Sequence, residues 1–439
     1  MSSVLQSPSH FSIFVILRNQ FMKRVSAFVQ EHIGDDTAKL ILNRAKWPEI
    51  DVELAVASIE SRRKLKNKVQ EWCDHPDLVF PVRLSAEQCS SSATAEYKAK
   101  LAEKIAGPAK HIADLTGGLG VDSWFFSKYF SEVLYNEMQE PLCMAAKYNF
   151  QQLDAKNISV SNLEIQADST ALHELLNNFR PDIVFIDPAR RGEGGKKVFL
   201  IEDCTPDVLT LRNDIFTHCR HLLIKLSPMA DISMVCNRLG SMCREVHVVA
   251  CGGECKELLI WMDREWQGDY CITAVEISRQ ARNDSISTLS SRDLSLSSRA
   301  RPEAESRDLL SLPPSPLYLF EPGKALMKAG FFDLIRDYFA IDKLAVSTHY
   351  YITDDAAKVA ELQKFGKVYS IISIQPLDKR TIKAAGKEYP HAEVTARNIP
   401  MDTETLRKKL GVTSGDDAHI FGLKSDRSGN LLIIGKRLV

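Results

Sequence analysis

Residues 110–122 read KHIADLTGGLGVD and join a short apolar strand to a glycine-rich loop and the start of a helix. Glycine lets the backbone turn sharply and approach a ligand without interference from a Cβ atom. The helical pattern that follows, VDSWFFSKYF over residues 121–130, offers unpaired N–H groups at its start. This order of elements is typical of an α/β sheet that binds ligands at the carboxyl ends of its strands.

Six more apolar runs follow this strand, and a helical pattern follows each of the first five of the seven runs. The runs occupy residues 111–117, 132–138, 163–169, 182–189, 221–228, 245–251 and 257–263. The alternation predicts βαβ units and a parallel sheet. The short connection between the last two runs favours an antiparallel pair at the end of the sheet. We predict an α/β fold with a Rossmann-like, seven-stranded sheet over residues 110–278, in the strand order 3-2-1-4-5-7-6.

The remaining parts of the chain differ from this region in sequence pattern and composition. Residues 1–21 lack a clear period and are expected to form a disordered extension, with Met22 as a second candidate start. Residues 22–109 have apolar side chains at helical spacing and predict a helical domain. Residues 279–340 hold ten serines between Ser285 and Ser315, which predicts a flexible linker or insertion. Residues 341–439 predict a small α+β domain, and their 16 basic and 12 acidic residues give a net charge of +4.

Composition excludes several classes of protein. With 44% hydrophobic and 26% charged residues among 439, the chain is neither a coiled coil nor a wholly disordered protein. Its net charge of −1 does not indicate a globally basic nucleic-acid binder, although local patches remain open. No apolar run approaches the roughly 20 residues that span a bilayer, and the ten cysteines form no CxxC pair. We therefore expect a cytoplasmic protein with reduced thiols, no membrane segment and no metal site.

One basic cluster in the helical part has two interpretations. It is either a solvated helix face or a contact to RNA phosphates. Its members are Arg62, Arg63, Lys64, Lys66 and Lys68.

The glycine loop predicts the cofactor. It contains no Gly-Lys-Ser/Thr and departs from GxGxxG, so it matches neither of the common phosphate-binding loops. It fits the D-x-x-x-G-x-G variant of enzymes that bind S-adenosylmethionine (SAM), a cofactor with a cationic amino group and no pyrophosphate. Asp114 is expected to approach that ammonium. The loop residues expected to line the cofactor are Thr116, Gly117, Gly118 and Gly120.

Two further acids follow the next two strands. Glu137 lies 20 residues beyond Gly117, the spacing at which a carboxylate clamps ribose hydroxyls in doubly wound folds. Asp168 ends the third run and could accept a hydrogen bond from the adenine amino group. Three acids at three successive strand ends favour SAM binding over three unrelated loop residues.

The fourth run ends in IDPARR over residues 186–191, which resembles the D/N-P-P-Y/F/K motif of class I methyltransferases that methylate base nitrogens. There an oxygen at the position of Asp187 and a backbone carbonyl hold the amine in line with the methyl group, and Asp187 also lines the cofactor site. Pro188 would rigidify this backbone. Arg190 replaces the usual bulky residue and could stack on a base or pair with phosphate. Lys225 closes the fifth run on the same sheet edge and is a candidate substrate contact.

Several blocks together resemble one family: bacterial class I SAM-dependent methyltransferase-like proteins with a ferredoxin-like insert and a C-terminal THUMP-like domain. The resemblance implies a ferredoxin-like insert within residues 279–340, a THUMP-like domain at 341–439, SAM as cofactor and an RNA substrate, tRNA or rRNA. The matching blocks are residues 84–101, 113–122, 185–191, 224–232, 252–259, 320–330 and 396–412.

Two alternatives to an RNA methyltransferase stay open. The Arg190 departure favours a non-catalytic RNA-binding or assembly factor that keeps the fold, since fold does not fix function. The acceptor could also be a small molecule or a protein. Upstream, the serines of residues 90–92 either cap a helix or belong to a lid over the cofactor.

Overall fold

The computed structural model describes residues 10–107, 110–190, 201–278, 285–294, 309–310 and 317–438. The chain divides into two compact units. The first comprises Met1–Arg244 and Leu259–Tyr270, and the second comprises Glu245–Leu258 and Cys271–Val439.

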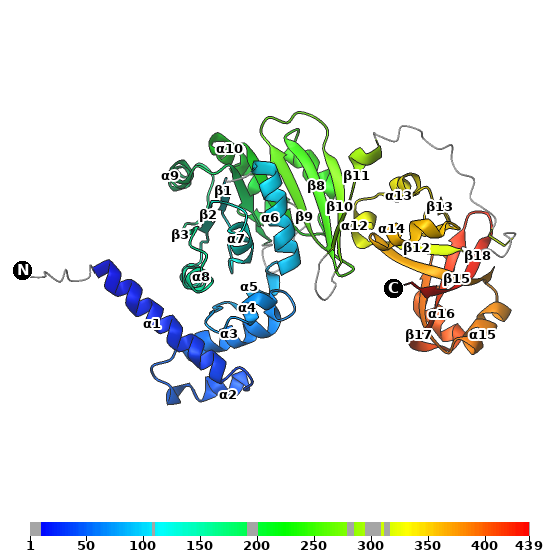
Figure 1. Cartoon of the computed structure of the whole chain (residues 1–439), viewed down its shortest axis with the longest axis horizontal. Coiled ribbons are helices and arrows are strands. Elements are labelled where there is room, and N and C mark those ends of the chain that lie inside the picture. Colours follow the sequence, from blue (N-terminus) through cyan, green and yellow to red (C-terminus); the bar gives the residue numbers. More distant parts are fainter. Residues whose placement is uncertain are drawn as a thin grey trace, which may run out of the picture. The chain divides into compact units, whose positions relative to one another are not determined.

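A large mixed sheet confirms the predicted topology. Its strands are β1 (His111–Asp114), β2 (Glu132–Asn136), β3 (Ile158–Ser161), β4 (Ile183–Ile186), β7 (His221–Leu226), β8 (Cys243–Cys251), β9 (Glu254–Asp263), β10 (Cys271–Ser278) and β11 (Ser285–Ser290). Their order is β3-β2-β1-β4-β7-β9-β8-β10-β11 (Figure 1). The pairs from β3 to β7 are parallel. Neighbours β8 and β9 are joined by Gly252 and Gly253 alone, which permits only an antiparallel pair. The predicted order 3-2-1-4-5-7-6 is therefore present, with β10 and β11 added beside β8.

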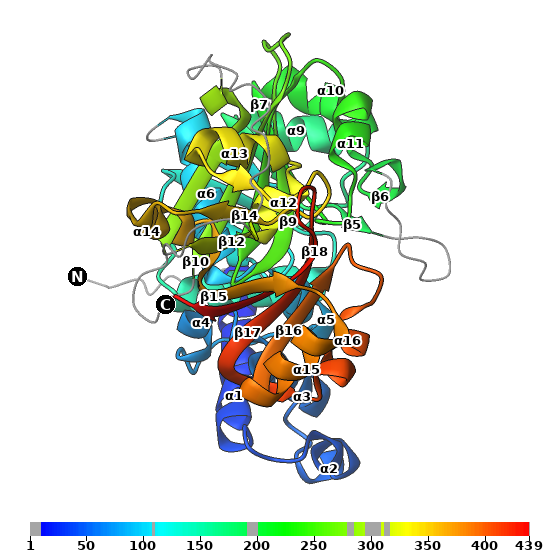
Figure 2. The same cartoon turned by 90° about the vertical axis from the view of Figure 1, so that its right-hand side faces the viewer.

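Helices lie on both sides of these strands. They are α6 (Ser92–Ala106), α7 (Val121–Phe126), α8 (Glu140–Gln152), α9 (Thr170–Phe179), α10 (Val208–His218) and α11 (Ile232–Leu239). Figure 2 shows α6 on one side of the strands and α9, α10 and α11 on the other. Covering on both faces explains why β4 is an unbroken apolar run whose four residues are all buried.

Two sequence predictions about strands were wrong. The third strand is Ile158–Ser161 rather than residues 163–169, because pairing with β2 selects the segment and an outer strand needs few apolar side chains. The Ser-rich stretch is not a linker throughout, since Ser285–Ser290 pairs antiparallel with β10 and buries Leu289. Backbone hydrogen bonds hold such an edge strand whatever its side chains. The rest of the expected linker, residues 279–284, 295–308 and 311–316, lies outside the described residues.

The N-terminal part is helical, as predicted. Its helices are α1 (His10–Glu31), α2 (Thr37–Leu42), α3 (Val52–Leu65), α4 (Gln70–Cys73) and α5 (Arg83–Gln88). Helix α1 begins at His10, so the expected extension to residue 21 was wrong from that residue on. Met22, Val25 and Val29 recur on one face of α1 and are buried in a core with residues of α3.

The C-terminal part is a second sheet with helices, the α+β arrangement that was predicted. Its strands are β12 (Tyr318–Pro322), β13 (Asp342–Lys343), β14 (Tyr351–Thr353), β15 (Gly366–Pro376), β16 (His391–Arg397), β17 (Thr413–Ser425) and β18 (Gly429–Arg437). Their order is β13-β14-β12-β15-β18-β17-β16. The helices are α12 (Lys324–Lys328), α13 (Phe332–Phe339), α14 (Val359–Gln363), α15 (Lys379–Glu388) and α16 (Thr403–Leu410).

Helices α15 and α16 lie side by side (Figures 1 and 2). A Cβ atom on Gly386 of α15 would lie 1.8 Å from the carbonyl oxygen of Leu410 in α16, so only glycine permits this approach.

The basic cluster of α3 is not a simple solvated face. Arg62 is 6% exposed, and its guanidinium donates to the carbonyl oxygens of Cys73, His75, Pro76 and Leu78. The guanidinium provides hydrogen bonds to carbonyl oxygens at the end of α4 and in the segment that follows it. It is therefore unavailable to RNA.

We expect Arg62→Met to lower the free energy of unfolding by about 2–4 kcal/mol, because it leaves buried carbonyl oxygens without donors. Lys66→Met, at an exposed position one turn away, is the matched control and should change stability by less than about 0.5 kcal/mol. Urea titration of both variants checks this. Equal stabilities would contradict a structural role for Arg62.

Candidate active site

The glycine loop follows β1 and is shaped by close approaches. Gly118 and Gly120 have φ values of +55° and +89°, a conformation that favours glycine. A Cβ atom on Gly117 would lie 2.2 Å from the ring of Tyr135. The Tyr135 hydroxyl donates to the carbonyl oxygen of Gly118 at 2.6 Å. The loop is therefore held against β2, where glycines are required for packing as well as for turning.

Glu137 also holds this loop. It follows β2, is 7% exposed, and accepts hydrogen bonds from the N–H groups of Gly118 (3.0 Å) and Gln139 (2.9 Å). Each carboxylate oxygen keeps a further lone pair that a hydroxyl could use. The structure thus places Glu137 beside the loop, as its spacing predicted, while its role toward ribose remains a prediction.

Asp114 ends β1 and is almost fully buried, at 1% exposure. Its carboxylate accepts from the Ser123 hydroxyl at 2.6 Å and from the N–H of Thr116 at 3.1 Å. Burial raises the pKa of Asp114 to about 8, and the charges of Asp122 and Asp187 add to the rise. A cation beside this carboxylate would favour its charged form.

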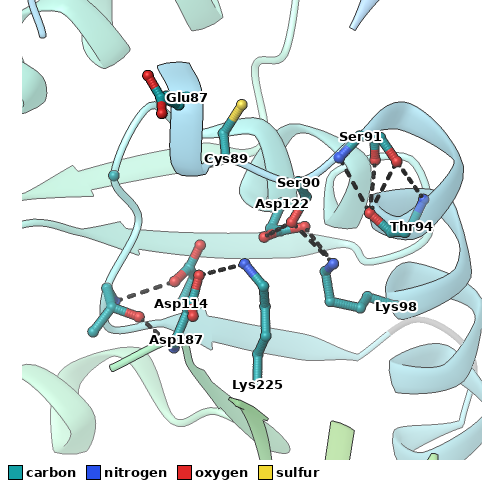
Figure 3. A network of polar contacts seen from close by, with 12 residues as sticks. Glu87, Cys89, Ser90, Ser91, Thr94, Lys98, Asp114, Asp122, Asp187 and Lys225 are labelled. Atoms are coloured by element: carbon teal, nitrogen blue, oxygen red, sulfur yellow. Dashed lines mark hydrogen bonds and ion pairs between the residues drawn. The ribbon is translucent and has the colours of Figure 1, made fainter. Parts of the chain in front are cut away.

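Asp187 and Lys225 form an ion pair at the same sheet edge. The register pairs Ile186 of β4 with Ile224 of β7, so the next residues, Asp187 and Lys225, are neighbours. The Lys225 Nζ atom lies 2.5 Å from Asp187 Oδ2, and the Asp187 side chain is 37% exposed. The Asp187 N–H donates to the Thr116 hydroxyl at 2.7 Å, which ties it to the glycine loop. Figure 3 shows the Lys225 ammonium pointing at Asp187, with Asp114 close by.

Of the other predicted residues, Asp168 is not joined to this group and the side chain of Arg190 is not described. Asp168 lies in the loop after β3, is exposed, and its N–H donates to Asp214 Oδ2 at 2.7 Å. Within the described part of the chain, no hydrogen bond or ion pair joins it to the Asp114 loop. The misplaced third strand explains why it was expected at a strand end. Arg190 pairs with Cys204 in a short two-stranded ladder, but its side chain lies outside the described residues. Pro188 is buried beside it.

A polar network that the sequence does not predict lies under α7. Lys98 of α6 is fully buried, and its Nζ atom lies 3.3 Å from Asp122 Oδ1 and 3.0 Å from the Ser90 hydroxyl. The Ser90 hydroxyl donates to Asp122 Oδ2 at 2.8 Å. For the serines of residues 90–92 the sequence left open a helix cap or a lid over the cofactor. The helix cap is present, since Ser91 and Thr94 form a capping box. A lysine and an aspartate 24 residues apart give no signal of pairing in sequence.

Among the described residues, no group of three or more His, Cys, Asp or Glu side chains could hold a metal ion. No helix in them is long and apolar enough to cross a membrane.

Comparison with known proteins places this site in a family. Residues 318–358 match a ferredoxin-like domain, and residues 366–437 match a THUMP domain-like family. A crystal structure of a candidate methyltransferase from Porphyromonas gingivalis W83 superposes with a TM-score of 0.77 at 26% identity, covering 96% of this chain and 99% of that chain. The chain thus carries a ferredoxin-like and a THUMP-like domain and shares its overall fold with a methyltransferase-like protein. These matches support the predicted resemblance, and the ferredoxin-like part begins after the Ser-rich stretch and runs past residue 340, later than predicted.

One curated relative of the family carries a name that mentions RNA. An uncharacterized RNA methyltransferase of Protochlamydia amoebophila (strain UWE25) is 27% identical over 170 residues. This match covers 36% of each protein, so the chain spans about a third of that relative's length.

The raised pKa of Asp114 predicts a pH dependence of stability. Between about pH 4 and pH 8 the folded state keeps a proton that the unfolded chain has lost, so the free energy of unfolding should fall as pH rises. Asp114→Asn should remove this contribution to the pH dependence. Between pH 5.5 and pH 8.5 its free energy of unfolding should therefore fall less than that of the wild type. Denaturant titrations at pH 5.5, 7 and 8.5 measure the difference. Parallel curves for both proteins would refute a raised pKa at Asp114.

Proposed function

We propose that this chain is a SAM-dependent methyltransferase whose acceptor is a base nitrogen of cytoplasmic RNA, tRNA or rRNA. The observation that carries the proposal is the Asp187–Lys225 pair beside Asp114 at the carboxyl edge of β1, β4 and β7. Ligands of doubly wound sheets bind at this edge. Family and fold support methyl transfer, and the THUMP-like match and the name of the curated relative support an RNA acceptor.

The residues present fit SAM. Asp114 offers a buried carboxylate to the ammonium of the cofactor, and its raised pKa marks a carboxylate that lacks a countercharge. No atom lies within 4 Å of a Cβ position on Gly118, so the loop is open there. Glu137 keeps lone pairs for ribose hydroxyls. When bound, SAM supplies an electrophilic methyl group on its sulfonium.

Asp187 would hold the acceptor amine. Its exposed carboxylate can accept an N–H of an exocyclic amine, while Lys225 and the Thr116 hydroxyl fix its position. Methyl transfer is a direct displacement, so orienting the nitrogen lone pair contributes much of the rate. Buried Pro188 restricts the backbone that follows.

The C-terminal domain supplies a surface for phosphate. Six basic side chains are exposed on the adjacent helices α15 and α16: Lys379, Arg380, Lys383, Lys387, Lys408 and Lys409. Arg407 differs from these residues because its guanidinium forms ion pairs. Its Nη2 atom lies 3.6 Å from Glu393 Oε2, and its Nε atom lies 3.8 Å from Glu404 Oε1. We therefore assign phosphate contacts to the lysines rather than to Arg407.

A second candidate is an RNA-binding or assembly factor without catalysis, which the replacement of the usual bulky residue by Arg190 favours. Calorimetry with SAM and S-adenosylhomocysteine, followed by incubation with methyl-labelled SAM and total RNA, protein extract or metabolites, separates the candidates. Label in RNA supports the proposal. RNA binding without label in any fraction supports the factor, and label only in protein or metabolites overturns the RNA acceptor.

Asp187→Ala should lower methyl transfer by about 100-fold or more, because the acceptor loses its orienting oxygen. Binding of RNA should stay within a few-fold of the wild type. Single-turnover assays and filter binding measure the two effects. An Asp187→Ala protein that still transfers methyl groups at the wild-type rate would remove Asp187 from the reaction.

Replacing Lys383, Lys387, Lys408 and Lys409 by Ala should weaken RNA binding by about 10-fold or more at low salt. It should also flatten the dependence of log affinity on log salt by up to about 3 units, since fewer counterions are released. Arg407→Ala, tested alone, is the matched control and should change the salt slope little. An unchanged slope in the quadruple variant would make these lysines a solvated face only.

A further inference from the structure

A fully buried lysine lies under the helix that follows the glycine loop. Lys98 is 0% exposed and contacts Asp122 and Ser90 (Figure 3). Asp122 is the second residue of α7, and Ser90 precedes α6. The network therefore joins the end of the N-terminal helical part to the first turn of α7.

Stability alone does not explain this network. Removing an ammonium and a carboxylate from water is expensive, and apolar residues of similar volume often serve a fold as well as a buried ion pair. What the pair provides is a fixed orientation of the Asp122 side chain, since an ion-paired and hydrogen-bonded carboxylate has one preferred position. Here that carboxylate is held from two sides, at Oδ1 by Lys98 and at Oδ2 by Ser90.

The first turn of α7 also reaches the candidate cofactor residue. Ser123, next to Asp122, donates to Asp114 Oδ2 at 2.6 Å. Asp122 lies between Gly120, which ends the glycine loop, and Ser123, which donates to Asp114. Holding Asp122 in place therefore holds both of these residues in place.

The network also sets the charge around Asp114. The carboxylates that act on it are Asp122 on α7 and Asp187 after β4, and each has its own lysine, Lys98 and Lys225. Without Lys98, the charge of Asp122 would act on Asp114 undiminished and disfavour the charged form that a cofactor ammonium requires.

We infer that Lys98 is a positioning residue for the cofactor, which acts through Asp122 and Ser123 on the carboxylate of Asp114. This inference rests on the proposed function, because it assigns Lys98 to the same SAM site. It makes α6 part of the cofactor-binding machinery rather than a neighbouring scaffold.

The principal test is the double variant Lys98→Met/Asp122→Asn, which removes both charges and leaves no buried charge unpaired. We expect it to keep the wild-type thermal unfolding midpoint and to bind S-adenosylhomocysteine about 10-fold more weakly, as measured by calorimetry. Lys100→Met is the matched control, since Lys100 is exposed on the same helix and pairs with Glu96. It should bind S-adenosylhomocysteine as the wild type does.

The single variant Lys98→Met separates positioning from mere support of the fold. It leaves the Asp122 carboxylate beside Asp114 without its lysine, so the pH below which S-adenosylhomocysteine affinity declines should move upward relative to the wild type. Wild-type affinity in the double variant overturns the inference, as does a loss that only parallels a lowered unfolding midpoint with no movement of the pH profile. If the wild-type chain itself binds no S-adenosylhomocysteine, the proposed function fails and this inference with it.

Discussion

The register between β4 and β7 is the constraint on which the candidate site depends. It sets Ile186 opposite Ile224, and the next pair, Asp187 and Lys225, emerges together at the sheet edge. A slip of one residue would turn one of the two charges to the opposite face. The burial of β4 on both faces opposes such a slip, because a shift along the strand would draw a flanking charged residue, Asp182 or Asp187, into the core. Packing of the sheet thus fixes the distance between two charged groups that contribute little to the packing themselves.

Charge is distributed unevenly over the acids of this edge. Asp122 and Asp187 each have a lysine within 3.3 Å, whereas no ion pair reaches Asp114 in the part of the chain that the structure describes. Burial therefore acts on Asp114 without compensation and raises its pKa. An uncompensated buried carboxylate is a suitable place for a cation to bind. This imbalance supports the cationic cofactor of the proposed function without reference to any sequence motif.

Sequence predicted those features that depend on local pattern. Asp114, Asp187 and Lys225 were found because parallel strands end at one edge, so residues that end different apolar runs come together. Features set by long-range pairing were missed or misplaced. Strands β3 and β11 form because β2 and β10 offer them backbone hydrogen bonds. Neither strand needs an apolar run, so neither has a pattern that the sequence would reveal. The sequence gives no sign of the Lys98–Asp122 pair, since only the fold brings Asp122 to Lys98.

The two sheets would divide the recognition of an RNA acceptor between them. Exposed lysines on α15 and α16 are mobile point charges, which suits phosphates and carries no information about sequence. The choice of base must then be made where a fixed hydrogen-bond acceptor meets the incoming nitrogen. Asp187 meets that requirement because its backbone N–H, its side chain and its strand are each held by a separate contact. Under the proposed function, orienting the acceptor nitrogen requires a rigid group and holding the phosphates does not, so the two tasks would fall to different domains.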